Sequence, residues 1–194
     1  MPTRTPPRPP AAADLPAGRW VVEATSEVGF VARELLVRRV QGRFRQFEGA
    51  LEVRPGITGT TVAGQALASS VDTGDPARDQ HLRQELLEAG RFPWLTLAGE
   101  VVAPGSVEGS WRLAAVLGIR DARRPLDLEV HVHGTQDEQA RPRLAMTALG
   151  TIKRSAFGLR FSSALETGGV IVADEVELVL RVAARPAYFF DEVK

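Results

Sequence analysis

The feature that most constrains this chain is a two-residue period of apolar side chains over two neighbouring segments. Residues 111–120 and 126–133 carry an apolar side chain at every second position: Trp111, Leu113, Ala115, Leu117 and Ile119, then Leu126, Leu128, Val130 and Val132. A period of two places each set on one face of a β-strand. Because only a short charged turn at 121–124 separates the two segments, the sequence predicts adjacent antiparallel strands.

Shorter segments repeat this pattern along the rest of the chain. Val28, Phe30 and Ala32 share one face of a predicted strand, and residues 176–182 give another apolar phase. Strands of this length joined by short turns predict an antiparallel sandwich or barrel, and closure into a barrel is favoured because it removes the sheet edges. Phe44 and Phe47 are out of phase, so a bulge must lie between them if both face inward.

Residues 60–71 form a predicted strand that is unusually rich in small side chains, including Ala63, Gly64, Ala66 and Ala68. Small side chains on the inner face of an eight-stranded barrel leave volume unfilled. Two interpretations follow, and the sequence favours neither. The volume is a ligand cavity, or it is filled by the close approach of another element such as a helix.

One helix is predicted, over residues 76–89. Asp75 is a good N-cap and Pro76 suits the first helical position. Leu82, Leu86 and Ala89 recur at helical spacing, and Gly90 ends the helix. Asp79 and Arg83 are four residues apart, so they are expected to pair on the solvent side. A single helix in an all-strand chain is typical of a lid or plug over a barrel end.

Composition narrows the class of protein. The chain has 194 residues, no cysteine and a formal net charge of zero, so one domain is expected and neither nucleic acid nor an anionic membrane surface is indicated. No run approaches the roughly 20 apolar residues of a membrane span. Residues 1–18 carry arginines and prolines where a signal peptide needs an apolar run, which predicts a disordered tail and a cytoplasmic protein.

The sequence makes no positive case for catalysis. It contains no GxSxG elbow, phosphate loop or dinucleotide-binding glycine pattern. His131 and His133 lie two apart on a predicted strand, so they share a face and could bind a metal ion together. They share that face with Asp127 and Glu129, which is the pattern of a solvated outer surface, and a metal-assisted enzyme is therefore only an alternative.

Five short motifs occur in order between residues 20 and 184: Gly42-Arg43-Phe44 with Phe47-Glu48-Gly49; Arg78-Asp79-Gln80-His81-Leu82-Arg83 followed by Phe92-Pro93; Leu117-Gly118-Ile119-Arg120 followed by Arg124-Pro125-Leu126; Thr151-Ile152-Lys153-Arg154-Ser155-Ala156-Phe157-Gly158-Leu159; and Ala173-Asp174-Glu175-Val176. Their order and spacing resemble those of the YceI-like polyisoprenoid-binding family.

The resemblance implies an antiparallel, eight-stranded lipocalin-like barrel over residues 19–184, with the helix bordering or capping one end and tails at 1–18 and 185–194. It implies an elongated apolar cavity that holds a long-chain isoprenoid or similar lipid, with no cofactor and no enzymatic role. A packed barrel that acts as an interaction or stress-response scaffold remains the main alternative. A homodimer is plausible by base rate.

The expected ligand-binding residues come from the apolar phases of the strands and of the helix, with two polar candidates near the mouth: Val28, Phe30, Phe44, Phe47, Leu82, Leu86, Trp94, Leu117, Ile119 and Phe157, with His81 and Arg154. Arg154 is the first candidate for contact with a lipid headgroup, since a guanidinium forks onto phosphate. The alternative is that Arg154 holds the helix through Asp79 or Glu85. His81 is the second candidate, and its alternative is an exposed pair with Glu85.

Overall fold

The computed structural model of the chain describes residues 15–34, 38–107, 109–160 and 172–191. Its strands form one antiparallel sheet: β1 (Gly18–Val22), β2 (Glu27–Glu34), β3 (Arg38–Phe44), β4 (Phe47–Val53), β5 (Thr61–Leu67), β6 (Val71–Asp72), β7 (Trp94–Pro104), β8 (Ser110–Ile119), β9 (Ala122–Gln136), β10 (Pro142–Lys153) and β11 (Val172–Pro186). The helical elements are short: η2 (Ala68–Ser70), α1 (Pro76–His81) with its continuation η3 (Leu82–Leu86), η4 (Arg154–Phe157) and α3 (Tyr188–Asp191).

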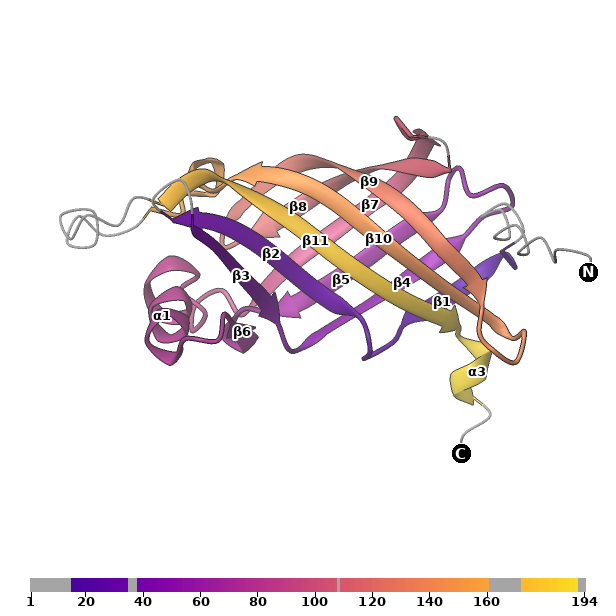
Figure 1. Cartoon of the computed structure of the whole chain (residues 1–194), viewed down its shortest axis with the longest axis horizontal. Helices are drawn as coiled ribbons and strands as arrows, with labels where there is room; N and C mark the ends of the chain where they lie inside the picture. Colours follow the sequence, from indigo (N-terminus) through magenta and orange to yellow (C-terminus); the bar gives the residue numbers. More distant parts are fainter. Residues whose placement is uncertain (1–14, 35–37, 108, 161–171, 192–194) are drawn as a thin grey trace, which may run out of the picture.

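The sheet closes on itself, as predicted (Figure 1). In the order β1-β4-β5-β7-β8-β9-β10-β11, each strand is hydrogen-bonded to the next, and β11 returns to pair with β1. Farther along, β11 pairs with β2, which extends the wall beyond β1 toward the end of the barrel where α1 lies. Strands β3 and β6 continue the ladder from β2. We call the end with α1 the mouth, and the opposite end, where β11 meets β1, the far end.

The bulge predicted between Phe44 and Phe47 corresponds to a break between β3 and β4. The amide of Arg45 donates to the carbonyl of Ser70 at 3.1 Å, and the amide of Gln46 donates to the Ser70 hydroxyl at 3.1 Å. These bonds satisfy the backbone where the regular ladder stops. The break allows both phenylalanines to face the interior.

The helix begins where the sequence predicts. The Asp75 carboxylate accepts hydrogen bonds from the amides of Ala77 at 3.0 Å and Arg78 at 3.1 Å. The predicted end at Ala89 is wrong, because the chain widens into a π turn over η3 and the amide of Leu87 donates to the carbonyl of Leu82 at 2.8 Å. Glu88 then takes a left-handed conformation with φ of 46°. The turn brings both Leu86 and Leu87 against the barrel interior, which a regular helix to Ala89 would not do.

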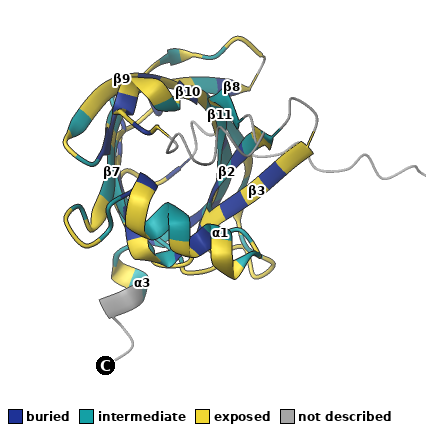
Figure 2. Ribbon diagram, turned by 90° about the vertical axis from the view of Figure 1, so that its left-hand side faces the viewer, coloured by how far each residue is buried: buried dark blue, intermediate teal, exposed yellow. Residues whose placement is uncertain are grey.

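The predicted solvent-side pair between Asp79 and Arg83 is also wrong. Asp79 is buried, and its carboxylate accepts from the Thr73 amide at 2.9 Å and the Thr73 hydroxyl at 2.6 Å. Arg83 donates to the carbonyl of Val71 at 2.7 Å. Both side chains therefore fasten the helix to the segment that contains β6, at the mouth of the barrel (Figure 2).

The predicted tails are shorter than expected. Residues 1–14 lie outside the described residues, but Leu15 is buried and the indole N–H of buried Trp20 donates to the carbonyl of Pro16 at 3.0 Å. At the other terminus β11 continues to Pro186, beyond the expected boundary at 184. No helix in the described ranges is both long and apolar enough to cross a bilayer.

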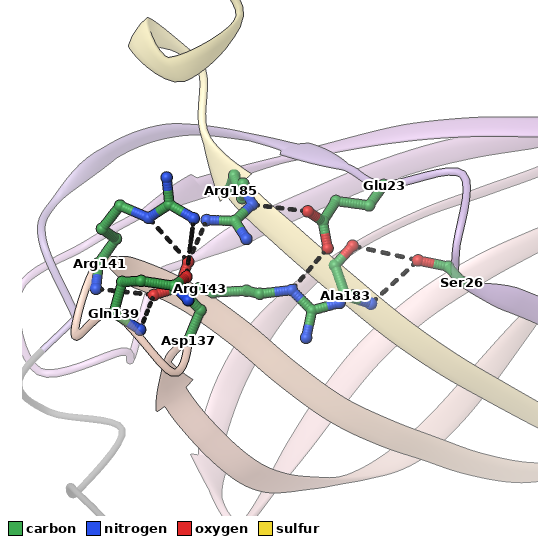
Figure 3. Close-up of polar contacts among 8 residues, drawn as sticks. All are labelled: Glu23, Ser26, Asp137, Gln139, Arg141, Arg143, Ala183 and Arg185. Carbon is green, nitrogen blue, oxygen red and sulfur yellow. Dashed lines mark hydrogen bonds and ion pairs between the residues drawn. The ribbon is translucent and has the colours of Figure 1, made fainter.

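An ion-pair network holds the far end together, and Figure 3 shows its members. Glu23, after β1, accepts from Arg143 of β10 at 2.8 Å and from Arg185 of β11 at 2.7 Å. Arg185 also donates to Asp137 at 3.1 Å, and Arg141 donates to the same carboxylate at 2.9 Å. The network therefore joins β1, β11 and the turn between β9 and β10, which are the segments that close the barrel.

Asp137 makes this network sensitive to acid. Burial raises the pKa of its carboxyl, but hydrogen bonds from the amides of Arg141 and Gln139 and from the guanidinium groups of Arg141 and Arg185 outweigh burial and hold the pKa well below the ordinary 3.8. A lowered pKa in the folded state stabilises the protein above the unfolded-state pKa, and this stabilisation is lost as the pH falls through the folded-state pKa.

We expect Asp137→Asn to lower the Tm by several degrees at pH 7, because Arg185 and Arg141 lose their shared anion. Since the wild type begins to lose this contribution below about pH 4, the difference in Tm between the two proteins should start to shrink there. Thermal unfolding followed by circular dichroism from pH 7 to pH 3 measures both effects. Glu52→Gln is the control, because the Arg19–Glu52 pair is exposed and should contribute little. Equal Tm changes for the two variants would contradict the structural role of the network.

Candidate functional site

The interior of the barrel contains an apolar cavity of about 240 Å³. Nine of the predicted residues line it: Val28, Phe30, Phe44, Phe47, Leu82, Leu86, Leu117, Ile119 and Arg154. The wall also includes residues that the predicted set omitted, such as Leu95 and Leu97 of β7 and Val176, Leu178 and Leu180 of β11. Their alternation in the sequence is the signal that would have found them.

The strand rich in small residues forms the thinnest part of the cavity wall. Gly64 of β5 lies directly opposite Gly49 of β4, and Ala66 lies opposite Phe47. Gly49, Gly64 and Ala66 all line the cavity. A Cβ atom on Gly64 would stand 3.1 Å from the carbonyl oxygen of Glu48, so backbone alone forms the wall at this point. The interpretation of these small residues as a cavity wall therefore agrees with the structure.

A smaller cavity of about 70 Å³ continues the first toward the far end. The two share Leu51, Val62 and Leu180 in their walls. Leu15 and Ile57, both buried, cover the end of the smaller cavity. The apolar space is therefore a tube that the chain covers at the far end.

Arg154 lies at the mouth end of the cavity wall, and its contacts differ from the helix-holding role that the sequence offered as the alternative. Its guanidinium donates to three backbone carbonyls, those of Leu159 at 2.8 Å, Val172 at 3.1 Å and Ala173 at 3.2 Å. The expected bonds to Asp79 or Glu85 are not among these contacts. Arg154 is thus a clasp that joins η4 to the start of β11.

A second contact strengthens the same junction. The Asp174 carboxylate accepts from the Ser155 hydroxyl at 2.7 Å and from the Ser155 amide at 2.9 Å. These two hydrogen bonds hold the pKa of the Asp174 carboxyl below its ordinary value of 3.8. The carboxylate therefore stays ionised at neutral pH and continues to anchor η4.

His81 is not part of the cavity wall. Its Nδ1 lies 3.0 Å from the Glu85 carboxylate one turn later, which is the helical pair that the sequence offered as the alternative. The side chain is largely buried, on the helix that borders the mouth. Its contribution is to the shape of that helix rather than to the apolar lining.

Two of the predicted cavity residues are misplaced. Trp94 is 43% exposed, because Leu95 and Leu97 take the inward phase of β7 and alternate positions face outward. Phe157 is buried in the hydrophobic core, where η4 lies against β9, and it does not reach the cavity.

The two strand histidines lie on the outer surface, as predicted. His133 Nε2 is 2.8 Å from the Thr147 hydroxyl, and His131 Nε2 is 4.0 Å from the Glu129 carboxylate. Across the described ranges, no three His, Asp or Glu side chains are grouped so that they could hold a metal ion. The structure therefore gives no support to a metal site at this surface.

The described residues thus form a closed antiparallel barrel around an apolar cavity. Residues 20–184 match the YceI-like domain, so this chain belongs to the YceI-like family. A UPF0312 protein of Staphylococcus aureus is 28% identical over 156 residues, which cover 79% of this chain and 89% of the relative.

Solved structures share the fold at low sequence identity. BcnA of Burkholderia cenocepacia has a TM-score of 0.72 and 22% identity, with 84% of this chain and 99% of BcnA covered. A polyisoprenoid binding domain from Saccharophagus degradans, implicated in plant cell wall breakdown, has a TM-score of 0.67 and 16% identity, with 86% of this chain and 98% of that domain covered.

We expect Arg154→Ala to destabilise the protein by about 2–3 kcal/mol, because three carbonyls lose a charged donor. The ligand occupancy of the folded fraction should not change, since the guanidinium donors are directed at three backbone carbonyls. Thermal unfolding and ligand titration measure the two quantities separately. Lys153→Ala, at the exposed neighbouring position, is the matched control. A loss of ligand affinity with no loss of stability would restore the headgroup interpretation.

Proposed function

We propose that this protein binds a long-chain isoprenoid or a similar amphipathic lipid in the barrel cavity and sequesters or carries it. The observation that carries this proposal is a tube with an almost wholly apolar wall that the chain covers at one end. Each CH₂ group that leaves water for such a wall contributes about 0.8 kcal/mol. Affinity for a long chain therefore requires neither a metal ion nor a catalytic group.

The cavity also argues against the alternative function, that of a packed barrel acting as a scaffold. A packed scaffold barrel would fill its interior at the density of other protein cores. Here Gly49 and Gly64 lie directly opposite each other on neighbouring strands. Neither places a side chain in the interior, so part of the interior stays unfilled. Unfilled apolar volume forgoes dispersion contacts, so its presence favours a protein that contains a ligand over a scaffold.

Isoprenoids are the first ligand class to test, because membership of the YceI-like family and a neighbour described as a polyisoprenoid binding domain both point to them. Organic extraction of the purified protein, followed by mass spectrometry, identifies a co-purifying lipid. We expect a long-chain lipid in near-stoichiometric amount. Protein without any extractable lipid that also fails to bind added isoprenoid alcohols would contradict the proposal.

A substitution that fills the cavity provides a second test. Ala66 is buried, lines the cavity and lies opposite Leu95 of β7. Ala66→Phe should lower lipid affinity by about tenfold or more, because even two CH₂ groups returned to water have that effect. The measurement is titration with a fluorescent isoprenoid analogue.

The matched control is Ala98→Phe, which adds the same side chain at an exposed position on β7. Overpacking costs typically 1–3 kcal/mol, so circular dichroism must show that both variants are folded at the assay temperature. Equal affinities for the two folded variants would show that the lipid does not occupy the cavity.

A further inference from the structure

We propose that the mouth of the barrel docks on an anionic lipid bilayer through an exposed tryptophan and a group of arginines. We call this surface the basic rim and define it as Trp94, Arg91, Arg123, Arg124 and Arg160. The proposal rests on the proposed function, since an insoluble cargo has to pass between a membrane and the cavity. It adds the surface at which this exchange takes place.

Trp94 is the aromatic part of the rim. Its side chain is 43% exposed, whereas Trp20 is 1% exposed. It opens β7, and the next residue, Leu95, lines the cavity. Tryptophan is enriched at the boundary between lipid headgroups and acyl chains, because its ring is apolar and its N–H is polar. An exposed tryptophan beside the mouth is therefore suited to insertion at a bilayer surface.

Among the described residues, the basic rim has more arginines than carboxylates that pair with them. Arg123, Arg124 and Arg160 are exposed, and none of them forms an ion pair with a residue in the described ranges. Arg91, which is 76% exposed, shares the carboxylate of Glu88 with Arg120. One anion thus serves two guanidinium groups, which leaves an excess of positive charge.

The acidic groups nearby offset this excess only in part. Asp174 accepts its hydrogen bonds from Ser155, and Glu175 lies directly opposite Lys153 in the ladder between β10 and β11. Asp121, at the turn between β8 and β9, is the exposed carboxylate closest in sequence to Arg123 and Arg124. The rim is therefore locally basic, although the whole chain has a net charge of zero.

The sheet register places Trp94 and Arg123 on one outward face, whereas Arg124, which pairs with Leu117, takes the opposite phase beside the turn. Thr96, Gly118 and Arg123 lie side by side across β7, β8 and β9. Trp94 precedes Thr96 by two residues and shares its outward face. With about 4.8 Å between neighbouring strands, Trp94 and Arg123 lie within the footprint of a few lipid headgroups. This surface borders the end of the barrel at which α1 lies (Figures 1 and 2).

Vesicle binding tests the proposal. The full-length protein is mixed with vesicles of phosphatidylcholine alone, or with one quarter phosphatidylglycerol, and bound protein is separated by flotation. We expect binding to the anionic vesicles only, weakening as salt is raised. Tryptophan fluorescence should shift to shorter wavelength on binding, and Trp94→Ala should remove most of that shift. Each basic residue near an anionic surface is worth about a fivefold change in affinity.

The triple variant R123Q/R124Q/R160Q should therefore bind on the order of 100-fold more weakly. The matched control is R19Q/R112Q/R181Q, which changes net charge equally but removes exposed arginines elsewhere on the barrel. The control should retain binding, and both triple variants should take up an isoprenoid analogue from detergent solution as the wild type does.

Three results would overturn the proposal: no binding to anionic vesicles, equal loss in the two triple variants, or binding that depends on charge and is unchanged in Trp94→Ala. The last result would identify a general polyanion site instead of a bilayer contact. Uptake from detergent reports on the cavity alone. A protein that takes up no lipid but still binds vesicles would contradict the proposed function and leave the docking surface intact.

Discussion

The backbone ladder between β11 and its neighbours is the interaction on which the rest of the structure depends. β11 pairs with β10 along one edge and with β1 and β2 along the other, so this strand closes the barrel. A wall held by continuous hydrogen bonds does not need a fully packed interior to keep its shape. Gly49 and Gly64 show the result, because they stay paired in register while contributing no side chain to the core.

The two most distinctive motifs of the chain fasten the mouth rather than form a reactive centre. Asp79 and Arg83 bind the segment at 71–73, which fixes the helix beside the opening. Arg154 binds the backbone carbonyls of Leu159 and Val172, which fixes η4 to β11. Both clasps are charged groups that bind mainly to backbone or hydroxyl atoms. The motifs therefore hold the elements at the mouth in place, whereas the cavity wall itself is apolar.

Residue periodicity predicted the strands of the barrel and their inner faces, and the Asp75 cap with Pro76 predicted the start of the helix, because each depends on local patterns. The end of the helix was missed because tertiary packing of Leu86 and Leu87 decides it. The partners of Arg154 were missed because they are main-chain carbonyls, which every residue carries alike. Trp94 was misplaced because its large apolar ring was assigned to the interior, although the alternation of Leu95 and Leu97 gives position 94 to the outer face. A net charge of zero gave no sign of the basic rim, since composition carries no information on position.

Under the proposed function, the cover that Leu15 and Ile57 place over the far end would dictate the order in which a lipid guest moves. A long chain that enters a tube with one opening goes in tail first and leaves head first. Its polar terminus stays at the entrance throughout, next to η4 and the helix. An enzyme that modifies this terminus would find it displayed while the apolar remainder stays out of water. The barrel would then keep the apolar chain of an otherwise insoluble molecule out of water while an enzyme reacts with its polar terminus.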